Sequence, residues 1–162
     1  VTDTRSPGWA YIVSHGGTYT WEVWMPSDAN GDSMSHAWGA NVLVDLQQSL
    51  LGVTPTSPAF ATMTIRPPSS GLQAATGTVP TQHGPVHVSW ARSSSSGASS
   101  QFQIDVTIPP NSSAMVMIPA PGQNAVSENG HPLRHDHGVR VVGKSGPYVE
   151  VEVGSGRYHF QS

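Results

Sequence analysis

The part of the chain after residue 53 consists of short segments in which apolar and polar residues alternate. Residues 102–108 show this alternation most clearly, and residues 86–90 and 148–153 repeat it. Alternation places successive side chains on opposite faces of a β-strand, so that one face can pack in a core. Because turn signals recur roughly every 8–12 residues, about eight short strands are expected. The sequence therefore predicts a mainly β fold, an antiparallel β-sandwich.

Composition supports this prediction and excludes some partners. Only 10% of the 162 residues are charged, while the chain holds 17 glycines and 14 prolines, which favours a β body with many turns over solvated helices. A net charge of −3 gives no reason to expect a nucleic-acid or anionic-membrane partner. No apolar run approaches the roughly 18 residues of a membrane-spanning helix, so no membrane segment is expected.

The first 53 residues carry a helical pattern instead. Between residues 35 and 51, apolar side chains recur every three or four positions, as on one face of an α-helix. Ser33 or Ser35 is expected to cap this helix, and Gly52 to end it. One amphipathic helix cannot bury its own apolar face, so this part must dock on the β body or on a missing part of a larger protein. The predicted organisation is a helical segment over residues 1–53 and a sandwich over residues 54–162.

Two aromatic stretches in the helical part suggest a carbohydrate site. Trp21 and Trp24 flank Glu22, and a polar loop separates them from His36 and Trp38. Sugar sites combine flat apolar rings with a carboxylate that moves a proton and a neutral group that binds hydroxyls. The alternative is that the tryptophans are core residues and that Glu22 pairs locally.

Three stretches resemble the C-terminal end of bacterial-type α-L-rhamnosidases. The first is GGTYTWEVW (residues 16–24) together with SHAWG (residues 35–39), which is similar to the end of that family's (α/α)6 catalytic barrel. The second comprises residues 51–60 and IRP (residues 65–67), which resemble the exit from the barrel. The third is GTVPTQHGPVHVSW (residues 77–90), which is similar to the opening of the C-terminal β-sandwich.

This resemblance implies roles for four residues. Glu22 corresponds to the general base of an inverting hydrolysis, and His36 to a histidine that contacts the bound rhamnose. Trp21 and Trp24 would shape the sugar pocket. Residues 1–53 would be the last helices of the barrel, and residues 54–162 the C-terminal sandwich. The implied partners are a rhamnose-containing glycoside or polysaccharide and the remainder of the barrel.

Inverting hydrolysis needs two carboxyl groups about 6.5–9.5 Å apart, one protonating the leaving oxygen and one activating water. In the resembled family the general acid lies upstream, so this chain is expected to supply only the base. We therefore expect a C-terminal fragment of a hydrolase that removes terminal α-L-rhamnose, inactive by itself. A rival from another class is a free-standing carbohydrate-binding or structural β-sandwich. The two differ in whether Trp21, Glu22 and His36 cluster in an open cleft.

Neither a cofactor nor a metal is expected. His135 and His137 lie two residues apart and could hold Zn²⁺ with Asp136 or His131, but a solvated loop after Asn129-Gly130 is favoured. Glu150 and Glu152 share one strand face and are interpreted as a solvent face rather than an acid–base pair.

The compartment is not fixed by the sequence, and a secreted protein is favoured. The chain has no cysteine and begins with neither Met nor a signal peptide, which fits a mature or excised chain. Asn111 opens an Asn-Ser-Ser triplet, the acceptor sequence for N-glycosylation in secreted eukaryotic proteins.

Overall fold

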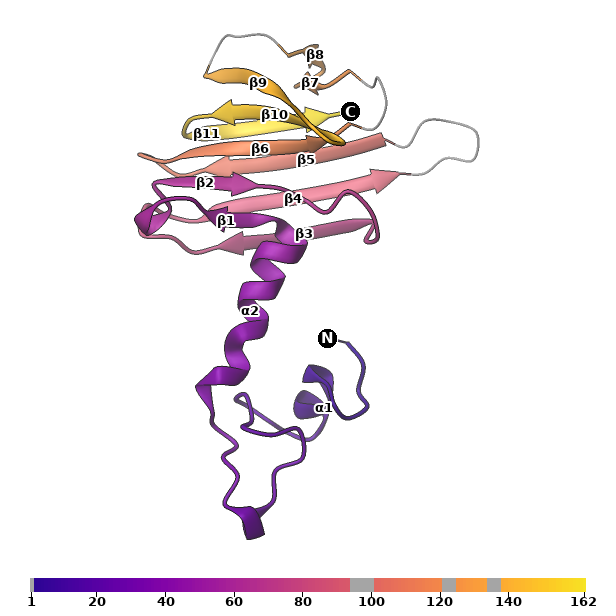
Figure 1. The fold of residues 1–162 in the computed structure, drawn as a ribbon, viewed down its shortest axis with the longest axis vertical. Coiled ribbons are helices and arrows are strands. Elements are labelled where there is room, and N and C mark those ends of the chain that lie inside the picture. Colours follow the sequence, from indigo (N-terminus) through magenta and orange to yellow (C-terminus); the bar gives the residue numbers. More distant parts are fainter. Residues whose placement is uncertain (1, 94–100, 121–124, 134–137) are drawn as a thin grey trace. The chain divides into compact units, whose positions relative to one another are not determined.

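The computed structural model describes residues 2–93, 101–120, 125–133 and 138–162 (Figure 1). The chain forms two compact units, Val1–Asp45 and Leu46–Ser162. Each unit is described by itself. The boundary between them falls within the helix predicted over residues 35–51.

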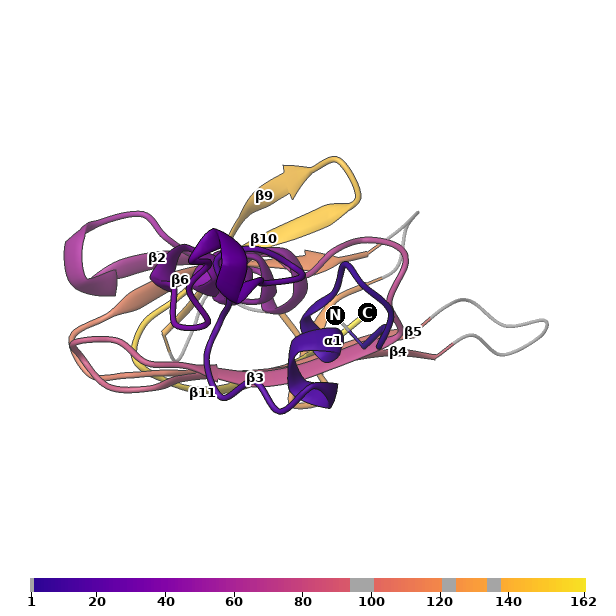
Figure 2. The same cartoon turned by 90° about the horizontal axis from the view of Figure 1, so that it is seen from below.

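The second unit is a sandwich of two sheets, which Figure 2 shows face to face. The first sheet has the order β1-β2-β6-β10-β9. Its strands are β1 (Val53–Pro55), β2 (Thr62–Ile65), β6 (Ser113–Pro119), β10 (Tyr148–Val153) and β9 (Val139–Ser145). The second sheet has the order β3-β4-β5-β11-β7-β8. Its strands are β3 (Ala74–Val79), β4 (Val86–Ser93), β5 (Gln101–Ile108), β11 (Gly156–Gln161), β7 (Ser127–Glu128) and β8 (His131–Pro132).

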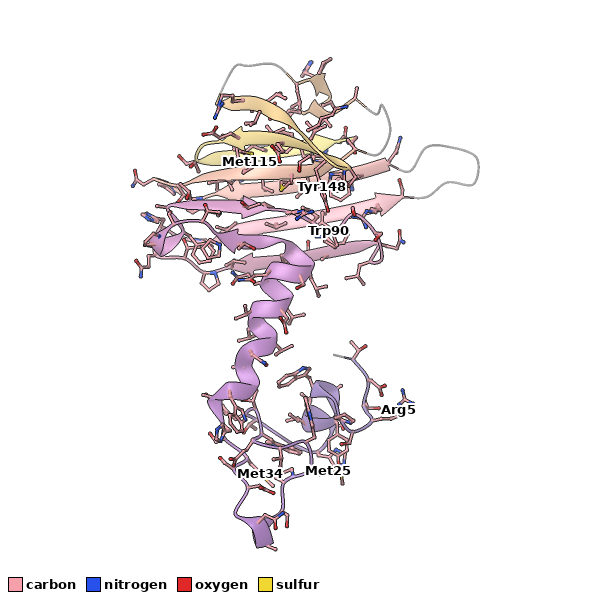
Figure 3. The ribbon with its side chains drawn as sticks, viewed as in Figure 1. Arg5, Met25, Met34, Trp90, Met115 and Tyr148 are labelled. Carbon is pink, nitrogen blue, oxygen red and sulfur yellow. The ribbon has the colours of Figure 1, made fainter. Side chains whose placement is uncertain are left out.

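The hydrophobic core lies between these two sheets. On β5 the residues Phe102, Ile104, Val106 and Ile108 are buried, while the polar residues between them face outward. Trp90 on β4 is 1% exposed and lies among the strands of the sandwich (Figure 3). The period-two pattern of the sequence is therefore the pattern of burial, as expected for strands with one buried face.

The predicted fold class is confirmed, and the differences are local. The described residues hold eleven strands rather than about eight. The short strands β1 and β8 were not predicted, because each contains a proline, Pro55 or Pro132, which favours a turn. All neighbouring strands are antiparallel except β2 and β6, which run parallel. The hairpin predicted at Asn129-Gly130 joins β7 to β8, and both residues have the positive φ, 49° and 79°, of a tight hairpin turn.

The first unit contains short helices and irregular chain. Helix α1 (Trp9–Ser14) ends at His15, and Gly16 follows with a φ of 76°. The 3₁₀-helix η1 (Asp28–Asn30) lies in the polar loop, and η2 (Ala37–Asn41) and α2 (Val42–Asp45) end the unit. The predicted helix is thus present, continuing in the second unit as the π-helix η3 (Leu46–Leu51).

The predicted serine cap of this helix is wrong. The N-cap residue is His36, and no side chain caps the helix. The backbone of His36 is extended, and its N–H donates to the carbonyl of Thr20 at 2.8 Å. The helix therefore begins only after this pairing ends.

Within the second unit, η3 is fixed to the sandwich. Trp90 Nε1 donates to the Leu50 carbonyl at 2.9 Å, and Gln47 Nε2 to the Val53 carbonyl at 3.2 Å. Gly52 ends the helix with a φ of 83°, as predicted. The short 3₁₀-helix η4 (Pro58–Phe60) then leads from β1 to β2.

The first unit buries little apolar surface. Among its described residues, Ile12 is the single buried hydrophobic one. Nine of the eleven exposed large hydrophobic residues of the described chain belong to this unit: Val13, Tyr19, Val23, Trp24, Met25, Met34, Trp38, Leu43 and Val44. Met25 and Met34 are labelled in Figure 3. No helix in the described part of the chain combines the length and the apolar character that a membrane crossing requires.

Candidate active site

Backbone pairing brings the two aromatic stretches of the first unit together. The Glu22 N–H donates to the Ser33 carbonyl at 2.8 Å, and the His36 N–H donates in the other direction, to the Thr20 carbonyl. The Thr20 hydroxyl also donates to the His36 carbonyl at 2.6 Å. Residues 20–22 and 33–36, separated by the polar loop, therefore lie side by side.

The Glu22 carboxylate is oriented by this pairing. Its Oε2 accepts a hydrogen bond from the Ser33 N–H at 2.9 Å and lies 3.7 Å from His36 Nδ1. About a third of each side chain is exposed, 31% for Glu22 and 34% for His36. The carboxylate and the imidazole thus lie next to each other, and both remain open to a ligand.

Trp38 lies against this pair, and the other aromatic rings of the first unit pack against one another. Trp38 Nε1 donates to the Glu22 carbonyl at 3.2 Å, and the Trp38 ring lies 4.2 Å from the His36 imidazole. The Trp24 ring meets Trp9 edge to face, with centroids 5.1 Å apart. Trp21 meets Tyr11 in the same way at 6.3 Å. These rings form apolar walls, which suits an apolar face of a ligand.

Four of the tryptophans and Glu22 line one hollow of about 330 Å³. Its lining residues are Trp9, Trp21, Glu22, Val23, Trp24, Trp38, Gly39 and Asn41. Among them, Glu22 is the one acidic residue. The predicted residues Glu22, Trp21 and Trp24 therefore share a hollow, with His36 beside it. Chemically, the arrangement offers a proton acceptor next to apolar walls, the combination found in sugar sites.

The sequence of the sandwich identifies its family. Residues 52–131 match the family model of the bacterial alpha-L-rhamnosidase C-terminal domain. These residues belong to that domain family. The resemblance predicted from the three sequence stretches is confirmed.

Relatives with this name match beyond the domain. An alpha-L-rhamnosidase of Streptomyces avermitilis is 30% identical over 162 residues, and one of Alteromonas sp. (strain LOR) is 33% identical over 124 residues. The matches cover 95% and 70% of this chain, but 14% and 13% of those proteins. The chain therefore spans about a seventh of the length of these relatives.

Solved structures of alpha-L-rhamnosidases share the fold. The crystal structure of the Streptomyces avermitilis enzyme complexed with L-rhamnose matches with a TM-score of 0.73 at 27% identity, over 99% of this chain and 15% of that chain. The structure from Dictyoglumus thermophilum matches with a TM-score of 0.76 at 24% identity, over 99% of this chain and 18% of that chain. At 24% identity, the match with the Dictyoglumus thermophilum structure shows only that the fold is shared.

Sequence reasoning missed several residues that shape the hollow of the first unit. Trp9 lies 15 positions before Trp24, and no local pattern connects them. Ser33 acts through its backbone N–H, which every residue except proline has. Close packing explains two glycines: a Cβ on Gly17 would lie 2.4 Å from Ile12 Cγ2, and one on Gly39 would lie 2.6 Å from Thr20 Cβ. Both glycines lie within the two aromatic stretches that the sequence singles out. The sequence does not show, however, that close packing requires a glycine at these positions.

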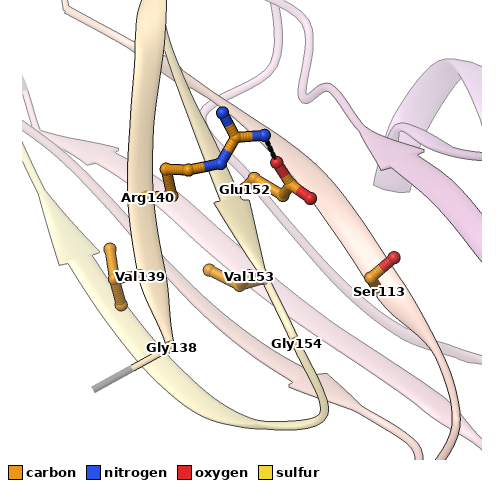
Figure 4. Close-up of a pocket in the computed structure, with 7 residues that line it drawn as sticks. All are labelled: Ser113, Gly138, Val139, Arg140, Glu152, Val153 and Gly154. Atoms are coloured by element: carbon orange, nitrogen blue, oxygen red, sulfur yellow. Dashed lines mark hydrogen bonds and ion pairs between the residues drawn. The ribbon is translucent and has the colours of Figure 1, made fainter. Parts of the chain in front are cut away.

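The C-terminal domain has a hollow of its own, of about 380 Å³ (Figure 4). It is lined by Ser113, Gly138, Val139, Arg140, Glu152, Val153 and Gly154. Arg140 and Glu152 form an ion pair across β9 and β10, with the Arg140 side chain 62% exposed and the Glu152 side chain 40% exposed. The Glu152 carboxylate is thus already paired with a cation, which supports the solvent-face interpretation over acid–base chemistry.

No three His, Asp or Glu side chains approach closely enough to hold a metal ion within the residues that the structure describes. His131 is exposed on β8. His135, Asp136 and His137, the other members of the metal cluster weighed above, lie outside the described residues.

Proposed function

We propose that this chain supplies one wall of the catalytic site, together with the C-terminal sandwich, of an α-L-rhamnosidase-like glycoside hydrolase. The enzyme would remove terminal α-L-rhamnose by inverting hydrolysis. The observation that carries the proposal is the Glu22 carboxylate in a hollow walled by Trp21 and Trp24, with His36 Nδ1 at 3.7 Å. The assignment of residues 1–53 to the end of the barrel is part of this proposal.

In the proposed reaction Glu22 acts as the general base. Its carboxylate takes a proton from the water molecule that attacks the anomeric carbon, on the side opposite the leaving oxygen. The bond to that oxygen breaks as the new bond forms, and a second carboxyl group protonates the leaving oxygen. His36 holds a rhamnose hydroxyl and so fixes the ring relative to Glu22. The Ser33 N–H keeps the carboxylate directed during the step.

The general acid would come from the remainder of the barrel, which is the proposed intramolecular partner. Glu22 is the one acidic residue that lines the hollow in the described chain. Nine large apolar side chains of the first unit are exposed, including Met25, Leu43 and Val44, and this concentration supports a covering partner. We infer that the 162-residue chain alone does not hydrolyse rhamnosides.

The test uses a longer polypeptide that carries this segment and cleaves an aryl α-L-rhamnoside. Glu22→Gln removes the base but keeps the shape, so kcat should fall about 10²–10⁴-fold, the usual contribution of general base catalysis. Glu152→Gln is the matched control, since it removes a surface carboxylate of the sandwich and should leave kcat within about twofold. A Glu22→Gln enzyme with unchanged kcat would exclude the proposed role.

A second measurement tests whether the 162-residue chain lacks a general acid. The purified 162-residue chain should release no aglycone from the same aryl rhamnoside. Turnover by this chain that disappears on Glu22→Gln substitution would show that it contains its own general acid. Binding of rhamnose glycans by the chain, combined with normal kcat in the Glu22→Gln enzyme, would favour the carbohydrate-binding module.

A further inference from the structure

Trp38 is the most exposed of the five tryptophans, although a hydrogen bond and a ring contact hold its side chain in place. Its side chain is 62% exposed, compared with 39% for Trp24 and 1% for Trp90, and Trp9 and Trp21 are half-buried. Its one polar atom, Nε1, donates to the Glu22 carbonyl at 3.2 Å. Its ring lies 4.2 Å from the His36 imidazole, with 37° between the two planes.

These contacts fix the indole between the two residues proposed to act on the sugar. A hydrogen bond at one edge and a ring at one side restrict its rotamers before any ligand arrives, so little side-chain entropy remains to be lost on binding. Trp38 also lines the hollow that Glu22 lines. A large, rigid and exposed aromatic surface is suited to an apolar ligand face.

We propose that Trp38 is the stacking platform for the sugar ring that Glu22 and His36 act on. This inference rests on the proposed function and deepens it. A 6-deoxy sugar presents C–H groups and a methyl group on its ring, which match an indole surface. The hydroxyls of the same ring can then point toward the Glu22 and His36 side chains. Trp38 would therefore contribute to substrate affinity, whereas Glu22 would contribute to the chemical step.

The experiment measures kcat and KM for an aryl α-L-rhamnoside in the longer polypeptide with substitutions at Trp38. Trp38→Ala removes the platform and should raise KM about tenfold, a loss of about 1.4 kcal/mol in binding. Trp38→Phe keeps a flat ring without the N–H and should stay within about threefold of the wild-type KM. Tyr19→Ala is the matched control, because Tyr19 is 53% exposed in the same unit and does not line the hollow; its KM should not change.

Two results would overturn the inference. The first is an unchanged KM for Trp38→Ala. The second is a Trp38→Phe enzyme as impaired as Trp38→Ala, since that would mean that the indole N–H positions Glu22 instead. If Trp38→Ala does not fold, Trp38→Leu replaces it, because Leu keeps apolar bulk without a flat face and should also raise KM.

A binding measurement separates this inference from the proposed function. L-Rhamnose is titrated into the Glu22→Gln enzyme, which has lost the base but keeps the pocket, and into its Trp38→Ala double variant. The double variant should bind about tenfold more weakly. Equal affinities, with Glu22→Gln inactive, would reject the platform and leave the proposed function standing. A fully active Glu22→Gln enzyme would instead reject the proposed function.

Discussion

At the scale of single residues, the candidate site depends on hydrogen bonds that the backbone makes between two stretches. Thr20 and Ser33 each make two hydrogen bonds, Thr20 to His36 and Ser33 to Glu22, and these bonds set the positions of His36 and Glu22. The functional side chains are thus held by neighbours that have no chemistry of their own.

Thr20→Val tests this positioning role. The substitution keeps the β-branched shape but removes the hydroxyl that donates to the His36 carbonyl at 2.6 Å. Losing a hydrogen bond to a half-buried carbonyl costs about 1–3 kcal/mol, so kcat/KM of the longer polypeptide should fall roughly tenfold. Thr20→Ser restores the donor and should recover most of the loss. Equal activity of the valine and serine variants would contradict the role.

Sequence reasoning found the residues that stand in a local motif and missed those that arrive through folding. Glu22, Trp21, Trp24 and His36 lie in two aromatic stretches, which is why they could be singled out. Trp9 reaches Trp24 only because α1 brings it there, and no periodicity records that contact. The alternative interpretation, in which Trp21, Trp24 and Trp38 are core residues, does not fit Trp38, which is 62% exposed.

At the scale of secondary structure, turns and strand ends depend on individual backbone conformations. Gly52 ends η3 with a φ of 83°, and a Cβ there would lie 2.3 Å from the Arg66 carbonyl carbon and oxygen. Its own carbonyl accepts from the Arg66 N–H at 2.9 Å. The path from η3 into β1 therefore has no room for a side chain.

Gly52→Ala should destabilise the 162-residue chain by at least about 2 kcal/mol, because it adds a steric clash to an unfavourable φ. Urea unfolding measures the change. Gly143→Ala is the matched control, since a Cβ on Gly143 meets no atom within 4 Å, and it should stay within about 0.5 kcal/mol of the parent chain. Equal stabilities for the two variants would contradict the packing at Gly52.

Elements were predictable where a repeating pattern covers them. The alternation of residues 102–108 predicted β5, and the asparagine–glycine pair predicted the β7–β8 turn. The parallel pairing of β2 with β6 joins strands 48 or more residues apart, and no local signal sets such a partner. The helix start was misplaced because pairing of His36 with Thr20, a tertiary contact, overrides the capping preference of serine.

At the scale of the whole chain, the two units differ in how much core each has. In the second unit, buried residues from both sheets form one cluster, which includes Trp90, Ile104, Val116 and Phe160. In the first unit, Ile12 is the one buried hydrophobic residue among those described. This contrast supports the proposal that the first unit is covered by a further part of a larger protein.

Hydrogen exchange of the 162-residue chain should separate the units. Local opening free energies follow local burial, so amides of β4, β5 and β6 should be at least about 2 kcal/mol more protected than those of residues 9–45. Mass spectrometry of peptides after timed exchange measures this difference. Equal protection of both units would mean that the first unit is stabilised as strongly as the sandwich.

The central claim is that Glu22 activates the water molecule, and azide rescue tests it most directly. In the longer polypeptide, Glu22→Ala should lower the cleavage rate of an aryl α-L-rhamnoside about 10²–10⁴-fold. Azide needs no deprotonation and can attack from the vacated side, so adding it should restore the rate and yield a rhamnosyl azide of inverted configuration. A Glu22→Ala enzyme that cleaves at the wild-type rate without azide would contradict the account.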